Sequence, residues 1–252
     1  SDIGLDYGVD HSSVAWGDYD NDGYLDILLT GNRLSKIFRN NGDNTFAIQD
    51  EISLENVDYS SASWGDYDND SRLDILLTGY TSSGGGSVIS KIYHNNGENA
   101  FSETGISLTG VRNGSVTWGD YDNDGYLDIL LSGQPDPYTY QRLSKIYHND
   151  GGNSFSVQTG TDLTQVNSSS SAWGDYDNDG YLDFLLTGSA YEGPVSKIYR
   201  NKGDNTFEQT DISLIGVYNG SVAWGDYDND GDLDILFTGH ANSGYITRIY
   251  RN

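Results

Sequence analysis

The chain has no cysteine and no methionine among its 252 residues, and it has only 3 prolines. Without cysteine it can form neither disulfides nor zinc–thiolate sites, and it cannot use a thiol in catalysis. Basic residues are also scarce, because 13 Lys and Arg stand against 38 Asp and Glu, for a formal net charge of −25. A charge of this sign repels phosphate backbones and anionic lipids, so we expect no nucleic-acid partner and no role at a membrane surface.

Long apolar runs are missing as well. No segment approaches the roughly 20 residues that a membrane-spanning helix needs, so we expect no membrane insertion. No signal-peptide pattern is visible at Ser1. Low hydrophobicity with high net charge would also suit a disordered chain, but the order of the residues predicts a folded one.

The sequence consists of five copies of one unit. A phrase of the type W-G-D-Y-D-N-D-G-Y-L-D-I-L-L-T-G opens each copy, and a phrase of the type S-K-I-Y-R-N follows about twenty residues later. The five phrases begin at Trp16, Trp64, Trp118, Trp173 and Trp224. A period near 50 residues with short strand-like segments is typical of propeller blades rather than helical solenoids. Tryptophan at one register in every copy indicates packing between blades.

Each unit offers four short strands, and helical periodicity is absent. We therefore predict an all-β fold, a five-bladed β-propeller of four-stranded blades that forms a single domain over residues 1–252. The last unit ends on its third strand, and residues 2–9 resemble the fourth strand of the other units. The N-terminal strand is therefore predicted to complete the last blade and close the ring. The alternative is that the chain was cut from a longer array.

Aspartates cluster directly after each Trp-Gly pair in the pattern D-x-D-x-D-G-x-x-D. Counted from the first Asp of each cluster, they occupy positions one, three, five and nine. The clusters are Asp18, Asp20, Asp22 and Asp26; Asp66, Asp68, Asp70 and Asp74; Asp120, Asp122, Asp124 and Asp128; Asp175, Asp177, Asp179 and Asp183; and Asp226, Asp228, Asp230 and Asp234. Four carboxylates within nine residues repel one another unless a cation lies among them.

Hard oxygen ligands at alternating positions suit Ca²⁺, and we predict about five Ca²⁺ ions, one per repeat. The backbone carbonyl at position seven would complete most of each shell. Position seven is Tyr24, Arg72, Tyr126, Tyr181 or Asp232. Ser71 replaces the usual glycine at position six, which predicts the weakest site there. The alternative is that the aspartates only cap turns.

These phrases resemble the FG-GAP/VCBS repeat family, and the resemblance covers nearly the whole chain. The family is similar in fold to the propeller of integrin α-subunits and to a fungal lectin propeller. The resemblance implies a Ca²⁺ ion in the Asp loop of each blade. It also implies an extracellular role in adhesion, glycan binding or assembly.

The loops between the second and third strands of the units differ in length and chemistry, unlike the Asp loops. Variable loops on a rigid scaffold are common binding sites, and aromatic side chains on them could stack on sugar rings. The candidate ligand-binding residues are Tyr80, Tyr138, Tyr140, Arg142, Tyr191 and Tyr245. The alternative is that these loops are solvated linkers.

No sequence cue indicates an enzyme. His94 and His148 occupy the position that arginine takes in the other copies, which indicates a structural role. We therefore predict an extracellular, secreted or cell-surface, non-catalytic binding or adhesion module. The leading prediction for its partner is a carbohydrate, and the other prediction is a protein surface ligand. The alternative is a structural or protein-interaction component of a surface layer, appendage or matrix, acting through self-assembly or as part of a larger parent protein.

Overall fold

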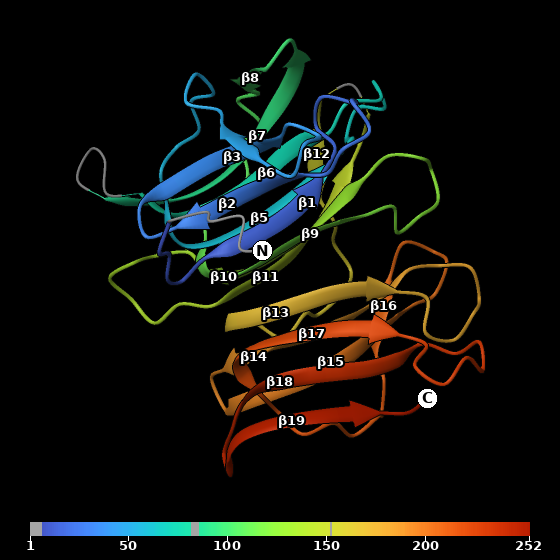
Figure 1. Cartoon of the computed structure of the whole chain (residues 1–252). Helices are drawn as coiled ribbons and strands as arrows, with labels where there is room; N and C mark the ends of the chain where they lie inside the picture. The colour runs from blue at the N-terminus through green and yellow to red at the C-terminus, as the bar shows by residue number, and fades with distance from the viewer. Residues whose placement is uncertain (1–6, 82–85, 152) are drawn as a thin grey trace.

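The computed structural model describes residues 7–81, 86–151 and 153–252, which form nineteen β-strands in five antiparallel sheets (Figure 1). The strands are β1 Ser13–Gly17, β2 Asp26–Gly31, β3 Leu34–Asn40, β4 Phe46–Ile48, β5 Asp58–Gly65, β6 Asp74–Thr81, β7 Ser87–Gly97, β8 Ala100–Glu103, β9 Arg112–Gly119, β10 Asp128–Gln134, β11 Leu143–Asn149, β12 Phe155–Val157, β13 Asn167–Gly174, β14 Asp183–Ala190, β15 Gly193–Asn201, β16 Phe207–Gln209, β17 Tyr218–Gly225, β18 Asp234–Ala241 and β19 Gly244–Tyr250. A helical segment that could span a membrane is not found in the part of the chain that the structure describes.

Each sheet is one sequence repeat, and its strands pair in the order in which they follow along the chain. The first four blades have four strands each, and the fifth has three, β17, β18 and β19. The predicted all-β, five-bladed propeller is therefore confirmed. In Figure 1 the first strands of the blades, β1, β5, β9, β13 and β17, run side by side through the middle of the molecule, and successive ones are in contact.

The second strand of each blade forms the centre of its core. In the first blade, β2 pairs with β1 so that Ile27 lies opposite Trp16 and Asp26 lies opposite Gly17. The equivalent strand β10 is buried at every residue, because neighbouring blades cover both of its faces. This explains its continuous apolar sequence, since a strand covered on both faces has no polar side to expose.

Successive blades are joined by a repeated aromatic contact. Trp64 of the second blade lies over Gly17 of the first, and its ring stacks on Tyr19 with centroids 6.0 Å apart. Asn95 of the second blade donates from Nδ2 to the carbonyl of Tyr19 at 2.9 Å. The same stacked pair recurs at the next three junctions. The interpretation of the tryptophans as packing between blades is confirmed.

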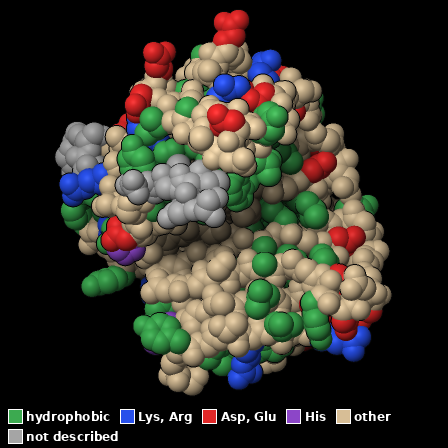
Figure 2. Space-filling model, viewed as in Figure 1, with side chains coloured by type: hydrophobic (Ala, Val, Ile, Leu, Met, Phe, Trp, Pro, Cys, Tyr) green, Lys and Arg blue, Asp and Glu red, His purple; other side chains and the backbone are tan. Residues whose placement is uncertain are grey.

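The two ends of the array do not repeat this junction among the described residues. Trp16 is 59% exposed, and nothing lies within 4 Å of a Cβ placed on Gly225. Leu236 and Ile249 of the fifth blade are about half exposed, although the equivalent leucine and isoleucine of the other blades are buried. Figure 2 shows one side of the molecule, in which a hollow is flanked above and below by exposed apolar side chains.

The predicted closing strand lies mostly outside the described residues. Residues 7–9, which are described, are not part of a strand. Tyr7 packs edge-on against Phe38 of the first blade, with ring centroids 5.4 Å apart. Completion of the last blade by the N-terminal segment therefore stays a prediction.

Candidate metal centres and ligand-binding face

The first aspartate of each Asp loop shapes the turn. Asp18 accepts hydrogen bonds from the backbone N–H groups of Asp22 and Gly23, at 3.0 and 2.8 Å. The other four loops repeat both bonds. Position six has a positive φ in all five loops, and Ser71 adopts it at 69° where the others have glycine. The loop backbone is therefore the same in every blade, whichever residue occupies position six.

The last aspartate of each loop is buried. Asp26 accepts from the backbone N–H of Tyr19 at 3.1 Å and from that of Asn40 at 2.8 Å. These bonds favour the charged form, but burial outweighs them. Burial raises the pKa of four of these carboxyls, to about 6 at Asp26 and Asp74 and to about 7 at Asp128 and Asp183. The pKa of each of these carboxyls is therefore set mainly by desolvation, which the two backbone N–H donors offset only in part.

Positions three and five share an arginine in three blades. Arg39 pairs with Asp20 through Nε, and with Asp22 through a second nitrogen at 2.7 Å. Arg200 pairs in the same way with Asp177 and Asp179, and Arg251 with Asp228 and Asp230. Each arginine comes from the third strand of its blade or the residue after it, so the pair ties the loop to the sheet.

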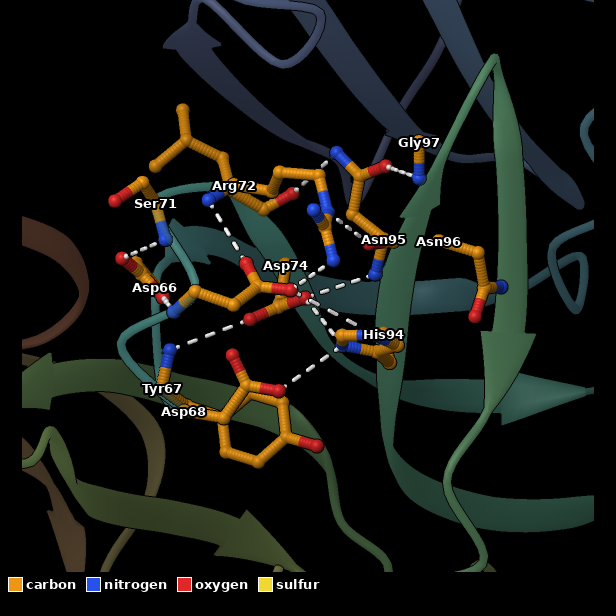
Figure 3. A network of polar contacts seen from close by, with 12 residues as sticks. Asp66, Tyr67, Asp68, Ser71, Arg72, Asp74, His94, Asn95, Asn96 and Gly97 are labelled. Carbon is orange, nitrogen blue, oxygen red and sulfur yellow. Dashed lines mark hydrogen bonds and ion pairs between the residues drawn. The ribbon is translucent and has the colours of Figure 1, made fainter.

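The second and third blades have histidine at this position. In the second blade, shown in Figure 3, His94 Nδ1 lies 3.2 Å from Asp68 Oδ2 and 3.3 Å from Asp74 Oδ1. In the third blade, His148 Nδ1 lies at similar distances from the aspartates at positions three and nine. The histidines therefore face the buried aspartate as well as position three.

The residue at position seven is tied to the aspartate at position five through its backbone. Tyr24 donates its backbone N–H to Asp22 Oδ1 at 3.0 Å. Arg72, Tyr126, Tyr181 and Asp232 make the equivalent bond in their loops. The guanidinium of Arg72 also pairs with Asp70, so the second loop has a fixed cation of its own.

The loops contain oxygen atoms that lack a partner. Oδ1 of the position-three aspartate is buried and has no hydrogen-bond donor in the first three blades, at Asp20, Asp68 and Asp122. Carboxylate oxygens of positions one, three and five also approach within 4.8 Å of one another in these blades. Buried polar atoms in proteins are almost always paired. An all-oxygen donor set with an unpaired buried atom fits a hard cation such as Ca²⁺.

The candidate ligand-binding residues lie at the opposite end of the blades from the Asp loops. Tyr138, Tyr140, Tyr191 and Tyr245 are largely exposed, and Tyr80 and Arg142 are partly buried. Three of the six meet between the third and fourth blades. Arg142 lies 4.5 Å from the ring centre of Tyr191 and donates to the carbonyl of Tyr140 at 3.2 Å.

The other candidates lie elsewhere on this rim. Tyr80 meets Arg112, whose guanidinium carbon lies 5.3 Å from the Tyr80 ring centre and 5.4 Å from that of Tyr59. Tyr245 packs against His240 of its own blade, with ring centroids 4.9 Å apart. The six residues are thus spread over several blades and do not form one cluster.

A central cavity of about 330 Å³ opens on the same face. All five blades line it, each through the residue five positions before its tryptophan: His11, Tyr59, Asn113, Ser168 and Asn219. These five residues have left-handed backbones, with φ between 47° and 52°. The rings of His11 and Tyr59 lie 4.2 Å apart, and Asn113 Nδ2 donates to Ser168 Oγ at 3.0 Å. No acidic residue is among the described residues that line the cavity.

Sequence reasoning missed these cavity residues. Their signal is that one position differs in chemistry between copies while the Trp-Gly-Asp phrase that follows it does not change. The left-handed backbone could not be anticipated, because it is uncommon for residues other than glycine, and tyrosine and serine are not among those enriched in it. It occurs where the first strand bulges against the second, as between Asp58 and Ser61.

A family model described as "FG-GAP-like repeat" matches residues 18–77, 79–131 and 187–237. These segments include four of the five Asp loops in full and omit the loop of the fourth blade. Among curated proteins, no sequence matches the chain significantly.

Among solved structures, the chain is similar to a lectin from Agrocybe aegerita, described by its specific recognition of non-reducing terminal N-acetylglucosamine. The TM-score is 0.61 at 20% identity, and the match covers 94% of this chain and 62% of the lectin. The chain therefore spans less than two thirds of the lectin's length. At this identity the likeness shows the fold alone.

Two weaker likenesses are to enzymes. A thermostable family-43 glycoside hydrolase matches with a TM-score of 0.46 at 9% identity, over 97% of this chain and 90% of the enzyme. A fructofuranosidase variant from Schwanniomyces occidentalis, complexed with fructosylnystose, matches with a TM-score of 0.40 at 12% identity, over 94% of this chain and 55% of the enzyme.

Proposed function

The chain belongs to the FG-GAP-like repeat family, and we propose that within it this protein is a Ca²⁺-binding, non-catalytic module that binds carbohydrate. The binding site is the central cavity, and the Asp loops at the other end of the blades hold the metal. The two sites are separate. Ca²⁺ therefore acts by stabilising the scaffold, and it does not contact the sugar.

In each loop the aspartates at positions one, three, five and nine, with the carbonyl at position seven, would hold one ion. The ion would supply the positive charge that the buried position-nine carboxylate lacks. The unpaired Oδ1 atoms of Asp20, Asp68 and Asp122 support this proposal. We further propose an extracellular location, where Ca²⁺ is abundant enough to fill such loops.

One observation carries the proposal of a carbohydrate ligand: the described residues that line the central cavity are polar or aromatic and include no Asp, Glu, Lys or Arg, in a protein with a net charge of −25. Asn113, Asn219 and Ser168 offer amide and hydroxyl groups that could pair with sugar hydroxyls. The paired rings of His11 and Tyr59 offer an aromatic surface against which the apolar side of a sugar could pack. Glycoside hydrolysis needs a pair of carboxyl groups, and the described lining residues provide none.

A glycan array with the Ca²⁺-loaded protein is the first test, followed by calorimetry with the best glycan. Tyr59→Asn is the informative variant, because asparagine occupies the same backbone position at Asn113 and Asn219. We expect it to weaken binding at least tenfold without lowering the melting temperature. Tyr245→Ser, on the rim of the same face, is the matched control and should bind like the parent.

Two results would contradict the proposal. A blank array from correctly folded protein would exclude carbohydrate binding at the concentrations tested. If instead Tyr245→Ser or Tyr140→Ser abolished binding and Tyr59→Asn did not, the rim tyrosines would form the site and the cavity would not.

The second candidate function is a protein-interaction or assembly role. It is favoured by the exposed apolar side chains on the outer surfaces of the first and fifth blades, which we call the end faces. Trp16 at one end, and Leu236 and Ile249 at the other, are apolar side chains of the kind that cover each other at the internal junctions. Contact between unlike end faces of two copies would build open or ring-shaped oligomers. Sedimentation velocity over a range of concentrations tests this role, and a monomer at every concentration would contradict it.

A further inference from the structure

The fifth blade has one strand fewer than the other four. Its sheet consists of β17, β18 and β19, whereas each of the other sheets has a fourth strand that pairs with the third. Among the described residues β19 is therefore an edge strand, and Figure 1 shows it at the free edge of the last blade. An edge strand presents unpaired backbone N–H and C=O groups to which another strand can bind.

A phenylalanine anchors the fourth strand in the complete blades. Phe207 begins β16, and its ring centre lies 5.4 Å from that of Tyr121 and 6.0 Å from that of Trp173. It also packs edge-on against Phe184, at 5.2 Å. The second and third blades repeat the contacts of this phenylalanine with the tyrosine and tryptophan of the blade junction. The fourth strand is thus held by one aromatic side chain between two blades.

The same place in the fifth blade is a pocket of about 160 Å³. Tyr176, Trp224 and Ile235 line it, and they occupy the positions of the three residues that contact Phe207 in the fourth blade. Tyr250 also lines the pocket and is only partly buried, whereas the equivalent aromatic residue is buried in every other blade. The lining that contacts phenylalanine in the complete blades is therefore repeated here around an open pocket.

The backbone of the complete blades shows how a strand would lie along β19. Residues 207–209 pair antiparallel with the last three residues of β15, and Thr210 then donates its N–H to the carbonyl of Ile198 at 2.9 Å. All four complete blades have this last bond to the isoleucine of their third strand. In the described part of the chain, the equivalent carbonyl of Ile249 has no such partner. A strand bound in the same register would place its phenylalanine opposite Asn252.

The charge along this edge indicates a further residue of the bound strand. Lys91 pairs with Glu103 at 2.9 Å, and Lys197 donates to Gln209 at 2.6 Å. Glu103 and Gln209 each lie two residues after the phenylalanine of their strand. Arg248 has the position of these lysines in the fifth blade; it is exposed and forms no ion pair with the described residues. A strand with glutamate or glutamine at the same place would therefore meet Arg248.

The described strands of this chain do not supply such a segment. All seven phenylalanines lie in strands of their own sheets, so a second copy has none to spare. The N-terminal segment, which the sequence predicts to complete this blade, contains no phenylalanine in residues 1–9. Its Tyr7 packs against Phe38 of the first blade. The occupant that fits the pocket is therefore a segment of another protein.

We propose that the free edge of the fifth blade binds an extended segment of a partner protein, of the sequence type Phe-x-Glu or Phe-x-Gln, which adds to β19 as an antiparallel fourth strand. Backbone hydrogen bonds to β19 supply affinity, as in other cases of strand addition, and the phenylalanine in the pocket sets the register. The acidic or amide side chain contacts Arg248. This site is separate from the central cavity, so the inference goes beyond the proposed function.

The probe is a fluorescently labelled peptide with the sequence of residues 202–211, K-G-D-N-T-F-E-Q-T-D, which is the turn and fourth strand of the fourth blade. Fluorescence anisotropy measures its binding to the intact chain. We expect saturable binding of one peptide per chain. Phe207→Ala in the peptide should weaken binding at least about tenfold, because a buried aromatic anchor carries much of the affinity of such an interface.

Arg248→Glu tests the predicted charge contact. The parent protein should prefer the peptide with Gln209→Glu over the peptide with Gln209→Lys, by up to about fivefold at low salt, and the variant should reverse this preference. Folding should be kept, because the Arg248 side chain is exposed and forms no ion pair with the described residues. Arg33→Glu makes the same change in net charge on the first blade, and this control should keep the preference of the parent.

Three outcomes would overturn the proposal. The first is that the folded protein shows no saturable binding of the peptide. The second is equal affinity for the peptide with Phe207→Ala, which would mean that the pocket does not select phenylalanine. The third is binding that appears only after residues 1–9 are deleted, which would mean that the N-terminal segment covers β19 in the intact chain.

Discussion

The indole of Trp118 covers Gly65 so closely that a Cβ on Gly65 would lie 2.6 Å from Trp118 Cδ1. The same contact joins Trp64 to Gly17 and recurs at the two later junctions, each between the tryptophan of one blade and the glycine of the blade before it. This glycine is therefore required for close approach of the blades, and its φ is not in the left-handed region that would also favour glycine.

Gly65→Ala is expected to destabilise the protein, because the added methyl group forces two blades apart. Overpacking of this kind costs about 1–3 kcal/mol. Gly225→Ala is the matched change at the end of the array, where a Cβ would meet nothing within 4 Å, and it should be nearly neutral. Urea denaturation of both variants measures the difference. If Gly225→Ala were as damaging as Gly65→Ala, the tryptophan of a first blade would cover it in solution, through ring closure or a second copy.

The repeats allowed much of the fold to be predicted from sequence. The Trp-Gly pair and the apolar second strand recur in each copy. The pairing of the first two strands in one blade therefore predicts their pairing in the others. The end faces could not be predicted, because Trp16 has the same sequence context as Trp118 and differs only in what covers it.

The candidate sites were predicted to different degrees. Asp18 and its equivalents could be recognised because the loop is local, so sequence spacing nearly fixes the geometry. The cavity was missed because His11 and Tyr59 are 48 residues apart and meet only through the arrangement of blades. His94 was interpreted as a structural substitute for arginine. Its orientation toward Asp74 required the paired strands to be placed in space.

Removal of metal should lower the melting temperature. A single site filled at 100 times its dissociation constant contributes about 2.7 kcal/mol, and each kcal/mol shifts the melting temperature by about 2–4 °C in a chain of this size. Chelation of several sites should therefore lower it by about 10 °C or more, while Asp20→Asn, which impairs one loop, should cost less. Calorimetry in Ca²⁺ and in EDTA makes the comparison. Equal melting temperatures would contradict the Ca²⁺ proposal.

In EDTA, the stability should fall as the pH rises from about 4 to about 7. Burial raises the pKa of Asp26 and Asp74 to about 6 and of Asp128 and Asp183 to about 7, above the value of about 3.9 for an unfolded aspartate. Between these values the folded state binds more protons than the unfolded state, so the free energy of unfolding decreases with pH. Urea denaturation at several pH values measures this slope.

Asp128→Asn tests the cause of that pH dependence. The amide has a similar shape but does not titrate, so the variant should lose less stability than the parent between about pH 4 and pH 7 in EDTA. A slope that is unchanged in the variant would assign the effect to the general repulsion of surface carboxylates. A stability that rises with pH in the parent would contradict the raised pKa values.

The residue at position six can be exchanged between the loops of the second and third blades, because the second has Ser71 there and the third has Gly125. Ser71 and Gly125 both donate their backbone N–H to the position-one aspartate at 2.9 Å, and both have a left-handed φ, of 69° and 90°. A Cβ on Gly125 would meet nothing within 4 Å, so Gly125→Ser tests the backbone cost alone. That cost is about 1–2 kcal/mol for a residue other than glycine.

Ser71→Gly should accordingly raise the melting temperature by a few degrees, and Gly125→Ser should lower it by a similar amount. The second-blade loop should also fill at a lower Ca²⁺ concentration after Ser71→Gly, because the ion no longer has to hold a strained turn. Calorimetry and Ca²⁺ titration of both variants test the pair. Opposite signs would mean that Ser71 stabilises the turn through its hydroxyl group, and the second loop would then not be the weakest of the five.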